Sequence, residues 1–141
     1  MIEHGRRRIL HFNLTRQPSA DWVVPQWREA FPEAAPYRYA ILDRDSIFDA
    51  NLLIFLKATG RTPKRTSVQA PWQNGMAERW IGSCRREILE HVIALNEEQL
   101  RRLIRDYIGC HQEDRTHDSL DKDTPNRGLV EPKPAADVTV I

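Results

Sequence analysis

The sequence predicts an α/β domain, on two observations. Short apolar segments with the alternation typical of strands are followed along the chain by longer segments whose apolar residues recur at helical spacing. The length of 141 residues, with 40% hydrophobic and 29% charged residues, is typical of a single globular domain. The predicted order is strand–helix–strand–helix–strand–helix–helix, which favours a sheet with helices packed against it.

The first part of the chain carries two predicted strands and the helix between them. Residues 7–15 alternate polar and apolar side chains, which predicts a strand with one buried face. Ser19 then caps a helix over residues 20–31, in which Pro25 bends or shortens the first turns. The second strand is predicted over residues 37–42, and it runs directly into a polar turn.

The second part of the chain carries one further strand and three helices. Asp49 caps a helix over residues 50–59, and a short strand, weakened by a proline, follows over residues 61–68. A polar loop then leads into a long helix predicted over residues 76–92, and a capping box at Asn96 begins the last helix. The predicted buried face of that last helix is Leu100, Leu103, Ile104, Tyr107 and Ile108.

Charge and cysteine content exclude several classes of protein. The net charge of +1 conceals basic clusters at residues 6–8, 61–65 and 101–105, which are either solvated faces or contacts for phosphates. The two cysteines suggest neither a disulfide framework nor a zinc pair, and the five histidines lack metal-site spacing. There is no apolar leader sequence and no apolar run of about 18 residues, so we expect a reducing, cytoplasmic setting and no membrane span.

Two carboxylates occupy positions suited to chemistry. Asp43 directly follows a predicted strand, and ligands of open α/β sheets bind outside the carboxyl ends of strands. Glu78 lies in the first turn of the long helix, and Arg85 follows it by seven residues on the same face. Each feature alone has a plainer explanation, because aspartate is common in turns and the helix dipole favours an early glutamate. Arg85 suits either a surface ion pair or a phosphate clamp beside a metal.

The combination is more specific than its parts, and three segments carry it. They are LDRDSIF at residues 42–48, SVQAPWQNGMAERWIGSCRRE at residues 67–87 and EDRTHDSL at residues 113–120. In these segments the chain resembles the DDE recombinases of the integrase and transposase superfamily, in particular bacterial insertion-sequence transposases. The resemblance implies a ribonuclease H-like core that cuts and joins DNA with two Mg²⁺ ions held by three carboxylates.

The resemblance also implies roles for particular residues. Asp43 and Glu78 match the second and third acids of the family, which are catalytic and bind the metal ions. Arg85 matches a basic residue that contacts DNA, and the loop before Glu78 matches a mobile loop that frames the active site. The other DNA-binding candidates are Asn74, Gly75, Arg79, Arg86, Lys64 and Arg65.

The first acid of the family has no counterpart in the sequence. The only aspartate before Asp43 is Asp21, which lies on a predicted helix rather than a strand. We therefore expect an incomplete ribonuclease H-like integrase core over residues 1–114, without the first strand and most of the second, and an extended C-terminal tail over residues 115–141. A truncated or decayed transposase of this kind is expected to be inactive alone.

Two other interpretations remain open. The chain would be a non-catalytic DNA-binding or oligomerising remnant that interferes with full-length transposase, or a plain α/β protein in which both acids are caps. Under the transposase interpretations, its partners are DNA, at transposon ends and targets, and a further copy or the full-length enzyme. The expected location is then the bacterial cytoplasm, at the nucleoid.

Overall fold

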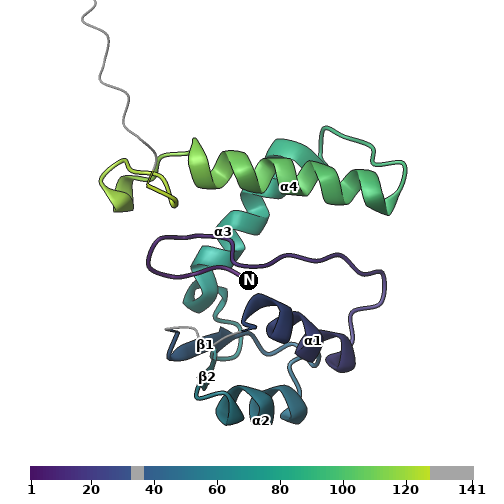
Figure 1. Cartoon of the computed structure of the whole chain (residues 1–141), viewed down its shortest axis with the longest axis vertical. Coiled ribbons are helices and arrows are strands. Elements are labelled where there is room, and N and C mark those ends of the chain that lie inside the picture. The colour runs from purple at the N-terminus through teal and green to yellow at the C-terminus, as the bar shows by residue number, and fades with distance from the viewer. Residues whose placement is uncertain (33–36, 128–141) are drawn as a thin grey trace, which may run out of the picture.

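The computed structural model describes residues 1–32 and 37–127 and shows a mixed α/β architecture, as predicted (Figure 1). The main elements are α1 (Ala20–Ala30), β1 (Tyr39–Leu42), α2 (Ala50–Ala58), β2 (Thr62–Arg65), α3 (Gly75–Cys84) and α4 (Glu97–Glu113). The minor elements are the 3-10 helices η1 (Pro71–Asn74) and η3 (Asp118–Leu120) and the π-helical turn η2 (Arg85–Leu89). α3 connects the strands, α1 and α2 at one end of the molecule to α4 at the other (Figure 1).

β1 and β2 form a parallel pair in which Tyr39 lies opposite Thr62. α2 connects them, because parallel strands need a crossover of this length. Ala40 and Leu42 of β1 are buried, and the alternating Tyr39 and Ile41 are exposed, as expected for a strand with one covered face. Within the described residues no further strand joins this sheet, so it consists of two strands only.

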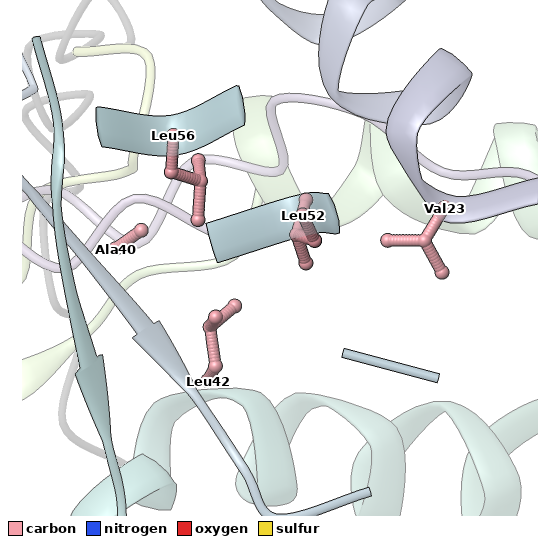
Figure 2. Packing of buried hydrophobic residues seen from close by; sticks show 5 residues of the cluster. All are labelled: Val23, Ala40, Leu42, Leu52 and Leu56. Carbon is pink, nitrogen blue, oxygen red and sulfur yellow. The ribbon is translucent and has the colours of Figure 1, made fainter. Parts of the chain in front are cut away.

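The main core lies between β1, α2 and α1. Figure 2 shows Ala40 and Leu42 of β1 beside Leu52 and Leu56 of α2, with Val23 of α1 in the same cluster. Leu52 and Leu56 are 0% exposed. An isolated helix of nine residues is marginal in water, so this packing is what holds α2 on the sheet.

Three helices begin at the predicted cap residues. The side chains of Ser19, Asp49 and Asn96 each accept a hydrogen bond from the backbone N–H three residues further on. In α4 the side chain of Gln99 accepts from the N–H of Leu95 at 2.9 Å. The predicted capping box is therefore present, with its second donor one residue before the cap.

A second buried cluster joins α3 to α4. Its buried members are Cys84, Ile104, Tyr107 and Ile108. Trp80 of α3 and Phe12 of the N-terminal segment pack against this cluster while remaining partly exposed. The N-terminal segment therefore takes part in the packing around α3 and α4 rather than in the sheet.

The predicted strand over residues 7–15 is wrong. The segment makes only an isolated antiparallel bridge between Ile2 and Ile9, and the N–H of Leu10 donates to the carbonyl of Met1 at 3.0 Å. A strand needs a neighbour to satisfy its backbone groups, and the described residues provide no neighbouring strand at this place. Ile9, Phe12 and Leu14 of the segment instead pack, partly buried, against the second cluster.

The helix predicted over residues 76–92 is shorter and changes its winding. The chain is α-helical from Gly75 to Cys84, and five residues of π-helix follow, closed by a hydrogen bond from the N–H of Glu90 to the carbonyl of Arg85 at 2.9 Å. The predicted last turn, up to Val92, is not helical and is exposed. It has no buried partner that would hold it in a helix.

Arg6 joins the N-terminal segment to the last described residues. Its Nη2 donates to the carboxylate of Asp123 at 2.7 Å, and its guanidinium also donates to the carbonyls of Thr124 and Pro125. Residues 115–127 are thus held against the body of the molecule. Residues 128–141 of the predicted tail lie outside the described residues, and the domain boundary at residue 114 stays a prediction.

Candidate nucleic-acid interface

Asp43 directly follows β1 and is half-buried. Its Oδ1 accepts a hydrogen bond from the N–H of Asp45 at 3.0 Å, which begins the turn that leads to α2. Asp45 is exposed, and its own Oδ1 accepts from the N–H of Ile47 at 3.1 Å. Asp45 therefore acts as a turn residue, and Asp43 is the carboxylate at the end of the strand.

Glu78 is exposed in the first turn of α3, and the loop before it determines where that helix begins. Gln73 braces this loop, because its Oε1 accepts from the N–H of Ser67 at 2.6 Å and its Nε2 donates to the Ser67 Oγ at 3.2 Å. η1 then leads directly into α3, with Asn74 at the N-cap position. The loop thus places Glu78 where the helix dipole favours a carboxylate.

The backbone of Gly75 does not require glycine. Its φ is −58°, and an added Cβ would have nothing within 4 Å. We expect Gly75→Ala to raise the free energy of unfolding, measured by urea denaturation, by up to about 1 kcal/mol, because alanine restricts the unfolded chain. Gly60 is the matched control: it also has nothing within 4 Å but lies at φ +78°, so Gly60→Ala should cost about 1 kcal/mol. If Gly75→Ala destabilised the protein as much as Gly60→Ala does, Gly75 would not have the helical backbone conformation described here at the start of α3.

The end of β1 and the start of α3 border an apolar cavity of about 400 Å³, whose lining includes Leu42 and Ala77. Asp43 and Glu78 do not line it. Over residues 1–32 and 37–127, no group of three or more His, Cys, Asp or Glu side chains is placed to hold a metal ion. The residues present therefore do not fit the two-ion Mg²⁺ site that the resemblance implies.

Three predicted DNA-binding arginines lie on α3 and η2. Arg79, Arg85 and Arg86 are all exposed. Because the chain is α-helical up to the residue before Arg85, that arginine keeps the face of Glu78, as the seven-residue spacing predicts. The arrangement presents one carboxylate and neighbouring guanidinium groups to solvent, which suits contact with a phosphate backbone.

The other two basic candidates, Lys64 and Arg65, are exposed on β2. Arg65 donates to the backbone carbonyl of Phe48, and the Lys64 ammonium lies 5.8 Å from the ring centroid of Tyr39. Both cations therefore already have contacts within the protein. They belong to a different element from Glu78 and the arginines of α3.

A bidentate ion pair that no sequence pattern indicates fixes η2 to the end of α4. Arg115 donates to both carboxylate oxygens of Glu87, at 2.8 and 2.9 Å, and the Tyr107 hydroxyl donates to Glu87 at 2.9 Å. The hydrogen bond from Arg115 lowers the pKa of the Glu87 carboxyl. Burial and the nearby carboxylate raise the pKa of Tyr107 to about 12. The only sequence signal here is that Arg115 lies in the EDRTHDSL segment.

The Glu87 ion pair predicts a pH dependence of stability. Because the pKa of Glu87 is lower in the folded protein, the pair stabilises the fold above the usual value of 4.5, and this contribution is lost as the pH falls through the folded-state pKa. We expect Glu87→Gln to cost about 1 kcal/mol at neutral pH and progressively less in acid, measured by urea denaturation. Glu90→Gln, at an exposed position just after η2, is the control. If the loss of unfolding free energy in Glu87→Gln did not change with pH, the charged Glu87–Arg115 pair would not be the source of that stability.

A second cavity, here called the basic cavity, lies beside the start of α3 and has a volume of about 460 Å³. Three of the predicted DNA-binding residues line it: Asn74, Gly75 and Arg79. Its ionisable lining residues are His4, Arg7, Arg79, His111, Arg115 and His117. All six are basic, and no carboxylate of the described residues lines the cavity.

Comparison with known proteins identifies one family. Residues 59–125 match the sequence profile of the integrase core domain. The matched segment contains Glu78, the loop before it and the arginines of α3 and η2, whereas Asp43 precedes it. No curated protein and no solved structure gives a significant match to the chain. Within the described residues, no helix is both long enough and apolar enough to cross a membrane.

Proposed function

We propose that the protein acts on DNA in integration and transposition. This chain belongs over residues 59–125 to the integrase core domain family, the catalytic core of DDE integrases and transposases. The observation that carries the proposal is the loop and helix within the matched segment, which present Glu78 and Arg85 on one exposed face. Such a function places the protein at the bacterial nucleoid, with transposon ends and target DNA as its partners.

The chain's own contribution is proposed to be binding and positioning of DNA. Asp43 and Glu78 correspond to two of the family's three acids, and the described residues do not fit a two-ion site. Arg85 would contact a backbone phosphate next to Glu78, and contacts of this kind fix the orientation of DNA on a protein. By itself the chain is then expected to bind DNA without cutting it.

Two assays on the same purified chain test this proposal. Fluorescence anisotropy with a short labelled duplex, at salt concentrations from about 50 to 200 mM, should show affinity that falls steeply with salt. A plasmid nicking assay with Mg²⁺ should show no cleavage. If no DNA binds at the lowest salt, the proposed function is wrong. If cleavage occurs and is lost in Glu78→Gln, the chain is an active nuclease rather than a binding component.

A second candidate function is association with another copy or with full-length transposase. The end of η2 and the connection from it to α4 expose four large apolar side chains, Leu89, Val92, Ile93 and Leu95, of which Ile93 is 86% and Leu95 83% exposed. Exposed apolar residues gathered in this way mark protein–protein contacts. Analytical ultracentrifugation should then show a dimer that Ile93→Ser with Leu95→Ser dissociates. A monomer at every concentration would exclude self-association through this segment.

A further inference from the structure

Polar atoms without partners gather around the basic cavity. Arg7 Nε, Trp80 Nε1, His111 Nδ1 and His117 Nε2 are buried and have no hydrogen-bond partner among the described residues. All four belong to residues that line the cavity, and His111 is only 6% exposed. Buried polar groups are normally hydrogen-bonded, so these four atoms keep hydrogen-bonding capacity for a bound ligand or water beside the cavity.

The protons on these atoms follow from the contacts of the same side chains. Arg7 Nη1 lies 3.3 Å from His117 Nδ1, and because a guanidinium can only donate, the neutral His117 ring carries its proton on the unpartnered Nε2. His111 Nε2 lies 3.4 Å from the carbonyl oxygen of Arg7, so it donates there. The unpartnered Nδ1 of neutral His111 is then an acceptor. Three unpartnered donors and one acceptor therefore belong to residues that line the cavity.

This set of atoms fits a phosphate group better than a cation. Arg7 and Arg79 line the cavity, and their positive charges would repel a metal ion. Arg115 also lines it, but Glu87 balances its charge. Burial lowers the pKa of His117, and the neighbouring His111 and Arg7 lower it further, which reports the same excess of positive charge. Phosphate oxygens can accept from all three donors, and a singly protonated phosphate monoester also has a hydroxyl that can donate to His111 Nδ1, whereas a backbone phosphodiester satisfies the three donors alone.

We infer that the basic cavity binds a phosphate group of a DNA strand. Trp72 also lines the cavity and is 73% exposed, so its indole is available to stack on a base next to the bound phosphate. The volume of about 460 Å³ is in the usual range for a small-ligand site. The assignment of DNA as the source of the phosphate rests on the proposed function, whereas the fit of the cavity to phosphate does not.

The first experiment titrates inorganic phosphate into the ¹⁵N-labelled full chain at constant ionic strength, followed by NMR. The Trp80 indole and the His111 and His117 rings should shift with one common, saturable dependence. Arg7→Gln should weaken binding by about tenfold, because it removes a charged donor. Arg8→Gln should have no effect, because that neighbouring side chain is exposed and does not line the cavity. His117→Gln provides a second test if Arg7→Gln does not fold.

The second experiment compares a 5′-phosphorylated short single strand with the same strand lacking that phosphate. Shifts of Trp80 and His117 with both strands indicate a backbone phosphate, and shifts with the phosphorylated strand alone indicate a terminal one; either supports the inference. Trp72→Ala should weaken binding of the strand but not of inorganic phosphate. If DNA binds while these resonances stay unchanged, the inference fails and the proposed function stands. If inorganic phosphate binds but no DNA does, the cavity is an anion site and the proposed function fails with the DNA assignment.

Discussion

Leu52→Ala is expected to lower the free energy of unfolding by about 3 kcal/mol, within the range for a fully buried leucine. Leu52 is 0% exposed and lies at the centre of the cluster that joins α2 to β1 and α1. Stability of a small domain is typically about 5–15 kcal/mol, so this loss would remove a large part of the total. Urea denaturation followed by circular dichroism measures the change.

Ile54→Ala is the matched control for this prediction. Ile54 lies on the same helix, two residues from Leu52, but is 65% exposed. Its truncation should change the free energy of unfolding by less than about 0.5 kcal/mol, because little of its surface is buried on folding. Equal losses in the two variants would mean that α2 does not pack on the sheet through the Leu52 face.

The double variant Arg85→Gln with Arg86→Gln is expected to bind DNA roughly tenfold more weakly than the unchanged chain. Both arginines are exposed on η2, which directly follows α3, so their loss should leave the fold intact. Each lost phosphate contact should also make the salt dependence of binding shallower by about one unit in the log–log slope. Anisotropy titrations at several salt concentrations measure both effects.

The variant Arg16→Gln with Arg38→Gln removes the same charge elsewhere. Arg16 is exposed in the loop before α1. Arg38 is exposed directly before β1, whereas Asp43 directly follows that strand. This control should keep nearly all of the affinity and the full salt slope. If the two double variants lose affinity equally, DNA responds to the total charge of the protein, and the α3 face is not its binding surface.

Local chemistry made the helix starts predictable, whereas strands depended on distant partners. Ser19, Asp49 and Asn96 cap helices through bonds to a donor three residues away, so the signal lies within a few residues of sequence. Residues 7–15 have the alternation of a strand, but alternation does not provide the neighbouring strand that a ladder needs. The π-helical turn after Cys84 was likewise invisible in the apolar spacing.

The same distinction applies to the candidate site. The prediction that pairs Glu78 with Arg85 needs only their seven-residue spacing, which is visible in the sequence; in the structure Glu78 lies on α3 and Arg85 begins η2. The basic cavity combines side chains of the N-terminal segment, α3, α4 and the segment after α4, which only the fold brings together. The Glu87–Arg115 pair spans 28 residues and was hidden for the same reason. Whether Asp43 and Glu78 act together stays a prediction.

The hydrogen bonds of Arg6 to Asp123, Thr124 and Pro125 have a consequence for cooperativity. They connect positions up to 119 residues apart, so this contact closes a loop that contains almost the whole described chain, and its formation carries the entropy cost of closing a long loop. The N-terminal segment and the residues around Asp123 should then open as one unit, with similar hydrogen-exchange protection. A protease cut in either segment should therefore lower the hydrogen-exchange protection of the other, and both segments contribute residues to the lining of the basic cavity.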